Sequence, residues 1–312
     1  MRTRPNFILS PRLKTIRTPS TLSVMFSELF RNLAKVVGYA YCIAAGTLFT
    51  FQRKLQYIPS AQRPSHPIRL SASFAAIEEI FTVSEDGLKL HGWHWPAVKG
   101  SMYAHISILH LHGNAGNREH RLRWAYMIRQ ELGCGVTLMD YRGYGGNKGR
   151  PSEAGLILDA IAAIKWHYDR KNAVDAKLVL HLESIGSVAG ITALLKVEPH
   201  VQRAISGIVV EGGLSSCIDL IRDSFRIFPL SLLMLDKWNN TCAAARRLNM
   251  KTHFLSLHGT SDAIVPLWCG RKLFDAVACE HKRFVHFNGG GHNDLLDQPT
   301  YIQTLEEFYA RL

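Results

Sequence analysis

Residues 178–188 read LVLHLESIGSV, an apolar run that passes directly into Ser184 and a stretch of small residues. The run predicts a buried strand, and the stretch after it predicts a helix, so Ser184 lies in a strand-to-helix turn. Such a turn lifts a serine Oγ above the sheet and directs the following N–H groups at a developing oxyanion. Gly186 gives this turn room, whereas Leu182 stands where a small residue is expected. The stretch predicts a nucleophilic serine, with a helix N-cap as the alternative.

Short apolar runs alternate with amphipathic segments along the rest of the chain. This alternation predicts an α/β fold with a mostly parallel, eight-stranded sheet, helices on both faces and an antiparallel hairpin around Asp86-Gly87. We expect strands at residues 81–83, 88–95, 106–111, 135–139, 178–182, 204–210, 252–257 and 284–287, and helices at 118–132, 152–168 and 188–195.

Two later segments follow apolar strands and contain an acid and a histidine. Residues 258–266 read HGTSDAIVP, and residues 288–294 read NGGGHND. Catalytic groups in parallel sheets gather at the carboxyl ends of strands, so we expect Ser184, Asp262 and His292 to meet. Asp262 would orient the imidazole, and His292 would act as the general base. A helix-capping aspartate and a loop histidine are the alternatives, but the order Ser, Asp, His is the one expected for this kind of turn.

The segment HLHGNAGN (residues 110–117) leaves another predicted strand. We expect the backbone N–H of Asn114 or Ala115, together with that of Ile185, to bind an oxyanion. A phosphate-binding loop is the alternative, but the segment has neither a G-x-G-x-x-G pattern nor a Walker lysine. The six cysteines form no C-x-x-C pair and no metal-ligand spacing, so we expect no metal site. We also expect no cofactor.

The formal charge of +12 is concentrated near the N-terminus. The first 54 residues carry nine of the 37 basic side chains and only one of the 25 acidic ones. A nucleic-acid-binding domain would instead spread its basic side chains over a folded face. We therefore expect no nucleic-acid partner.

The segment VVGYAYCIAAGTLFTF (Val36–Phe51) has no charged residue, and Leu33 and Ala34 extend it if Lys35 directs its ammonium to the membrane interface. It predicts a single membrane anchor over residues 33–51, with a buried amphipathic helix as the alternative. A basic leader (1–32) precedes the anchor. A Pro/Ser-rich linker (52–76) and the catalytic domain (77–312) follow it.

The distribution of charge around the span bears on the compartment. More basic residues precede the span than follow it, which favours a cytoplasmic N-terminus and an endomembrane location of the endoplasmic-reticulum type. Residues 1–27 are rich in Arg, Ser and Thr and contain no acid, which is also typical of a mitochondrial presequence.

Several motifs occur in order along the chain, with consistent spacing. They are FQRKLQYIPS (51–60), HGNAGN (112–117), DYRGYGGNKGRPSEAGL (140–156), ESIGS (183–187), VVEGGLSS (209–216), KWNN (237–240), HGTSDAIVP (258–266) and GGHNDL (290–295). Over roughly residues 37–312 the chain resembles the membrane-anchored α/β-hydrolases of the fungal bud-emergence type and their animal α/β-hydrolase-domain relatives. Glu183 stands where glutamine or arginine is common in that family.

This resemblance implies an α/β-hydrolase fold with a short helical insertion over the site, at about residues 214–248. By the same resemblance Ser184 is the nucleophile, Asp262 the acid and His292 the base, and Asn114 or Ala115 and Ile185 are the oxyanion donors. Some relatives remove palmitate from cysteine thioesters, so the implied substrate is an acylated protein or a lipid-like ester. A lipase or small-ester esterase is one alternative, and a membrane-tethered scaffold impaired by Leu182 is another.

The stretch FRIFPLSLLML (Phe225–Leu235) is strongly apolar. We expect it to form part of an acyl channel or, alternatively, a core helix.

Overall fold

The computed structural model describes residues 21–171, 176–222, 225 and 227–312. The chain divides into two compact units, residues 1–50 and Phe51–Leu312. Most of the predicted leader lies outside the described residues, which begin at Thr21.

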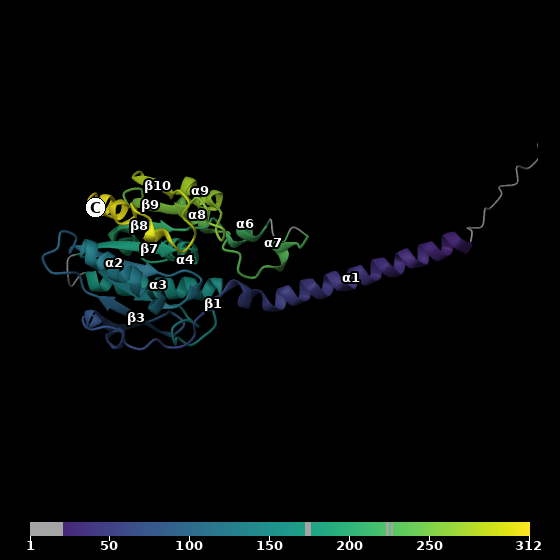
Figure 1. Cartoon of the computed structure of the whole chain (residues 1–312), viewed down its shortest axis with the longest axis horizontal. Helices are drawn as coiled ribbons and strands as arrows, with labels where there is room; N and C mark the ends of the chain where they lie inside the picture. The colour runs from purple at the N-terminus through teal and green to yellow at the C-terminus, as the bar shows by residue number, and fades with distance from the viewer. Residues whose placement is uncertain (1–20, 172–175, 223–224, 226) are drawn as a thin grey trace, which may run out of the picture. The chain divides into compact units, whose positions relative to one another are not determined.

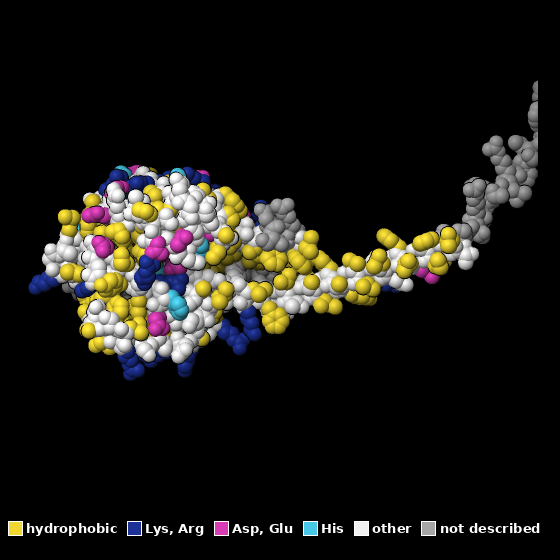
Figure 2. All heavy atoms as spheres, in the orientation of Figure 1, with side chains coloured by type: hydrophobic (Ala, Val, Ile, Leu, Met, Phe, Trp, Pro, Cys, Tyr) yellow, Lys and Arg dark blue, Asp and Glu magenta, His cyan; other side chains and the backbone are white. Residues whose placement is uncertain are grey.

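Helix α1 (Thr21–Gln56) contains the predicted anchor and extends beyond it at both ends. Among the described residues, only its stretch Val24–Gln56 is long and apolar enough to cross a bilayer, and the most apolar part of this stretch contains no buried residue. Figure 2 shows hydrophobic side chains along its surface. The helix thus has the length and composition that a membrane span requires.

The second unit is built on one eight-stranded sheet with the strand order β10-β9-β8-β7-β4-β6-β3-β2 (Figure 1). All neighbouring pairs are parallel except β2–β3 and β3–β6. The predicted fold class is confirmed, including the hairpin that opens the sheet. The strands are β2 (Glu78–Val83), β3 (Lys89–Trp95), β4 (Ile106–Leu111), β6 (Gly135–Met139), β7 (Lys177–Glu183), β8 (Ile205–Glu211), β9 (His253–Gly259) and β10 (Lys282–Phe287).

Helices cover both faces of the sheet, because the central strands are apolar on both sides. On β7, Leu180 packs into a cluster with α3 and α4, whereas its neighbour Val179 packs into a second cluster with α2 and α10. The helices are α2 (Leu122–Leu132), α3 (Glu153–Lys171), α4 (Ile185–Leu194), α5 (Pro199–Ala204), α6 (Cys217–Ile221), α7 (Leu230–Leu233), α8 (Thr241–Ala245), α9 (Leu267–Ala276) and α10 (Tyr301–Tyr309), with short 3₁₀ turns at Pro67–Arg69, Ala72–Phe74, Arg118–Arg121 and Leu295–Asp297.

The segment for which we expected a linker is folded onto the domain. Strand β1 (Ile58–Pro59) pairs in parallel with β5 (Ala115–Gly116). The carbonyl of Ser60 accepts a hydrogen bond from Gly145 N–H at 2.9 Å, and Tyr57 is buried. A Pro/Ser-rich composition does not reveal such backbone pairing, which depends on residues far along the chain.

Candidate active site

Ser184 lies between β7 and α4, in the predicted strand-to-helix turn. Its backbone has φ 52° and ψ −115°, and such a conformation costs a non-glycine residue on the order of 1–3 kcal/mol. Two hydrogen bonds hold the turn: Ser184 N–H donates to the Glu211 carbonyl at 2.8 Å, and Ser187 Oγ donates to the Ser184 carbonyl at 2.6 Å. The turn is therefore of the strained kind that presents a nucleophile above a parallel sheet.

Two glycines on α4 make room for this turn. A Cβ on Gly186 would collide with the carbonyl oxygen of Leu111 at the end of β4. A Cβ on Gly190 would lie 2.5 Å from Cδ2 of Leu182, whose side chain is fully buried. Leu182 is therefore accommodated because position 190, one helical turn beyond Gly186, has no side chain.

Asp262 and His292 form a direct pair. His292 Nδ1 lies 2.6 Å from Asp262 Oδ2, while Asp262 Oδ1 accepts hydrogen bonds from the N–H groups of Ile264 and Val265 at 2.9 and 2.7 Å. Burial opposes ionisation of Asp262, but the hydrogen bonds and the charge of His292 outweigh it and lower the pKa of this carboxyl. The carboxylate is thus a fixed acceptor that assigns the imidazole proton to Nδ1 and leaves Nε2 as the basic nitrogen.

Ser184 and His292 both border the end of β8. The Glu211 carbonyl holds Ser184 N–H at 2.8 Å, and the next residue, Gly212, packs against the imidazole. Gly212 has φ 56°, and a Cβ on it would lie 2.8 Å from His292 Cε1. No hydrogen bond joins Ser184 Oγ to His292, although both lie in the described part of the chain. This contact often tightens only when substrate binds.

The predicted oxyanion donors belong to two segments, the start of α4 and the loop after β4. Ile185 is the first residue of α4, so its N–H is among the donors that a helix N-terminus leaves unpaired. In the loop after β4, Tyr144 donates its hydroxyl to the Asn114 carbonyl at 2.8 Å. Because the peptide unit is planar and trans, this bond directs the Ala115 N–H to the opposite side.

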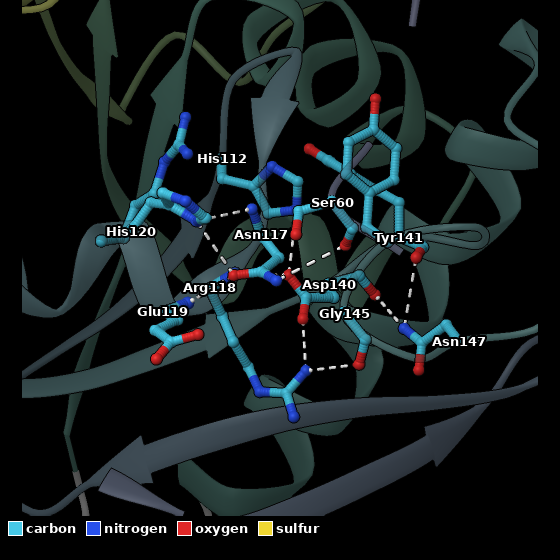
Figure 3. A network of polar contacts seen from close by, with 12 residues as sticks. Ser60, His112, Asn117, Arg118, Glu119, His120, Asp140, Tyr141, Gly145 and Asn147 are labelled. Carbon is cyan, nitrogen blue, oxygen red and sulfur yellow. Dashed lines mark hydrogen bonds and ion pairs between the residues drawn. The ribbon is translucent and has the colours of Figure 1, made fainter. Parts of the chain in front are cut away.

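A buried ion pair supports the loop that contains Asn114 and Ala115 (Figure 3). The Asp140 carboxylate accepts the backbone N–H of Arg118 at 2.7 Å, pairs with the Arg118 guanidinium and lies 3.3 Å from His112 Nε2. Burial opposes ionisation of Asp140, but its hydrogen bonds and the neighbouring charges lower the pKa of this carboxyl. Asn117 continues the network with a contact to the Ser60 carbonyl at 3.4 Å. The loop is thus tied to β6 and to the segment after α1.

Glu183, the acid beside Ser184, faces inward. Arg121 holds its carboxylate beneath the HGNAG loop. Among the described residues, no group of three or more His, Cys, Asp or Glu side chains is arranged to hold a metal ion, and all six cysteines are free.

The comparisons with known proteins agree with this architecture. No protein-family profile matches the chain. The α/β-hydrolase domain-containing protein WAV2 of Arabidopsis thaliana is 30% identical over 282 residues, which cover 82% of this chain and 87% of that protein. The chain belongs to the α/β-hydrolase family.

One further relative and one solved structure are similar to the chain. The protein bem46 of Schizosaccharomyces pombe is 29% identical to this chain over 296 residues, which cover 91% of this chain and 95% of that protein. The resemblance to the bud-emergence type is thereby confirmed. The structure of the Pyrococcus furiosus esterase Pf2001 matches with a TM-score of 0.61 at 20% identity, over 82% of this chain and 97% of that one, a likeness of fold.

Sequence reasoning missed the residues that support this α/β-hydrolase site. Arg121, Tyr144 and Gly212 contact predicted site residues but carried no predicted role. Tyr144 and Gly212 lie within two of the family-like motifs, so motif membership was a signal for them, whereas Arg121 lies four residues beyond HGNAGN and had no such signal.

Leu182 and Gly190 are predicted to be energetically coupled. Gly190→Ala should lower the free energy of unfolding by about 1–3 kcal/mol, because its Cβ crowds Leu182 in a packed core. In a Leu182→Ala background the same change should instead be stabilising by up to about 1 kcal/mol through helix propensity. Denaturant unfolding of the wild type, the two single variants and the double variant measures the coupling energy. An equal loss of unfolding free energy from Gly190→Ala in both backgrounds would show that Leu182 does not occupy the space beside position 190.

Gly212→Ala tests the position of His292. The new Cβ would displace the imidazole, and a displacement of about 1 Å can cost on the order of 100-fold in turnover. Gly87→Ala is the matched control, since Gly87 also has a positive φ, of 80°, but nothing lies within 4 Å of its added Cβ. We expect similar losses of melting temperature in the two variants and a loss of activity only in Gly212→Ala. Unchanged activity in Gly212→Ala would show that Gly212 does not determine the position of the His292 imidazole.

Proposed function

We propose that the chain is a membrane-anchored serine hydrolase that cleaves acyl esters or thioesters, with acylated proteins as a candidate substrate class. One observation carries the proposal: Ser184 occupies a strained strand-to-helix turn that shares the end of β8 with the hydrogen-bonded Asp262–His292 pair. Membership of the α/β-hydrolase family and the fold likeness to an esterase support it.

In this proposal Ser184 Oγ attacks the acyl carbonyl carbon while His292 Nε2 accepts the hydroxyl proton. The carbonyl π electrons move to oxygen, where the N–H groups of Ile185 and of Asn114 or Ala115 stabilise the charge. Collapse breaks the bond to the leaving oxygen or sulfur, which takes the proton from His292. Water then attacks the acyl-serine by the same steps and releases a carboxylic acid, and Asp262 holds the imidazole throughout.

The alternative of an impaired scaffold rests on Leu182. Gly190 provides the space that Leu182 needs, and Gly186 keeps the close approach of α4 to β4. The departure at position 182 therefore gives no structural reason for a distorted elbow, which favours the enzyme.

The insertion supports a substrate with an apolar acyl chain. Gln52, near the end of α1, donates to the Leu233 carbonyl at 3.1 Å and accepts from Leu235 N–H at 2.7 Å, and Arg53 pairs with Asp236 at 2.7 Å. The segment around α7 is therefore fastened to the last turns of α1. Leu232 is 80% exposed and Leu235 is 49% exposed, which does not fit the alternative of a core helix.

A fluorophosphonate probe tests the nucleophile. Wild-type protein in detergent should be labelled, Ser184→Ala should not, and Ser73→Ala, at an exposed serine, should be labelled as wild type is.

Asp262→Asn should fold and lose turnover by about 10⁴-fold, because the imidazole tautomer is no longer fixed. Turnover of a palmitoyl thioester compared with p-nitrophenyl butyrate then separates the thioesterase from the small-ester esterase. A folded wild type that the probe does not label would contradict the proposal.

The exposed leucines of the insertion predict a chain-length effect. Leu232→Asp and Leu235→Asp should lower kcat/KM for a long-chain acyl substrate in lipid vesicles while leaving the short butyrate ester unaffected, because a charge opposes burial in an apolar phase. Met102→Asp, at a residue 77% exposed in another loop, is the control. The protein itself should resist alkaline carbonate extraction. Equal losses of kcat/KM with both substrates would indicate that Leu232 and Leu235 contribute to folding and do not contact the acyl chain.

We propose an endomembrane location with the catalytic domain in the lumen, on the basis of the basic residues before the span, and a mitochondrial location as the alternative. Protease protection of the full chain in microsomes distinguishes the two.

A further inference from the structure

A mostly buried carboxylate lies directly beside the candidate nucleophile. Glu183 precedes Ser184, and its side chain is 19% exposed. An uncompensated negative charge at this place would oppose the negative charge that develops on the carbonyl oxygen in the transition state, most strongly where water is excluded. The partner of Glu183 is therefore important to the chemistry.

Its main partner is Arg121, on the turn that leads into α2, and His110 Nε2 also lies 3.5 Å from Glu183 Oε2. Arg121 Nε lies 2.9 Å from Glu183 Oε2 and its Nη2 lies 2.5 Å from Oε1, a bidentate pair with planar geometry. Burial opposes ionisation of Glu183, but the charge and hydrogen bonds of Arg121 outweigh it and lower the pKa of the carboxyl to about 2. Glu183 is thus held as an anion whose charge is balanced locally.

The same guanidinium also reaches across to the opposite loop. Its Nη1 donates to the Ala115 carbonyl at 2.7 Å. Because guanidinium donors form a rigid planar fork, one side chain fixes the Ala115 peptide relative to the residue before Ser184. A lysine, whose donors radiate from one nitrogen, cannot span both partners in this way.

Two glycines of the HGNAG loop (residues 112–116) lie close to this ion pair. A Cβ on Gly113 would lie 2.5 Å from Glu183 Oε1, and a Cβ on Gly116 would lie 3.0 Å from Arg121 Nη1. The loop backbone therefore lies too close to the ion pair for a side chain at position 113 or 116.

We propose that Arg121 and Glu183 are positioning residues that set the separation between the two halves of the oxyanion hole, the loop at Asn114 and Ala115 and the N–H of Ile185. This inference rests on the proposed hydrolase function. It assigns to Glu183 a role in orienting Arg121 and so explains how an acid is tolerated beside Ser184.

Arg121→Lys is the principal test, in the full chain with p-nitrophenyl butyrate. Loss of oxyanion-hole geometry should lower kcat by about 100-fold, with KM changed by less than about threefold, since an interaction made mainly in the transition state leaves ground-state binding intact. Arg123→Lys is the matched control: Arg123 lies two residues further on and pairs with Asp297 at the surface, where both side chains are more than half exposed. It should leave kcat and KM unchanged.

A boronic acid inhibitor gives the second readout, because its tetrahedral serine adduct places an oxygen in the oxyanion hole. The affinity of Arg121→Lys for the boronic acid should fall by the same factor as its kcat/KM. A purely structural defect would not lower these two quantities by equal factors. If Arg121→Lys fails to fold, the double variant Arg121→Met with Glu183→Gln removes both charges and should show the same fall.

The outcomes separate this inference from the proposed function. Wild-type turnover with unchanged kcat and unchanged boronate affinity in a folded Arg121→Lys would overturn the positioning role and leave the hydrolase standing. A wild type that neither turns over the ester nor reacts with a fluorophosphonate would overturn the proposed function itself.

Discussion

The hydrogen bond from Ser184 N–H to the Glu211 carbonyl is the contact on which the site depends. It fastens the strained turn after β7 to the end of β8, and the residue after Glu211 supports His292. Strain of this size persists only where the surroundings over-determine the backbone. Here the surroundings are the close approach of Gly186 to β4 and the hydrogen bonds of Ser187 to the Ser184 carbonyl.

Three acids, one buried and two partly buried, lie at or just beyond the carboxyl ends of β6, β7 and β8, and each has its own donors. Asp140 follows β6 and pairs with Arg118; Glu183 ends β7 and pairs with Arg121; Glu211 ends β8 and lies 3.0 Å from His181 Nε2 and 2.7 Å from the Tyr301 hydroxyl. Buried charge is tolerated only when it is paired and hydrogen-bonded. The first two pairs connect the sheet to the turn that follows the Asn114–Ala115 loop, which makes the loop position specific at some cost in desolvation.

Much of the fold could be predicted from the sequence, because strands buried on both faces read as apolar runs and helices as amphipathic stretches. The prediction that Ser184, Asp262 and His292 meet rested on their places after three different strands, β7, β9 and β10, and the hydrogen bond between Asp262 and His292 is the part of it that the structure contains. The accommodation of Leu182 could not be predicted, since it depends on Gly190 in the following helix. Nor could the partner of Glu183, which lies 62 residues away, or the pairing of Ile58 with Ala115, because sequence spacing does not specify contacts of this range.

The central claim is that Ser184 is the acylated nucleophile, and a trapped acyl-enzyme tests it most directly. Rapid acid quench of the full chain during turnover of p-nitrophenyl butyrate, followed by mass spectrometry of the tryptic peptide 178–196, locates the acyl group. The account predicts that one butyryl group replaces one proton on Ser184 and not on Ser187, and that the adduct accumulates before steady state. An adduct on another residue, or turnover without any covalent adduct, would contradict it.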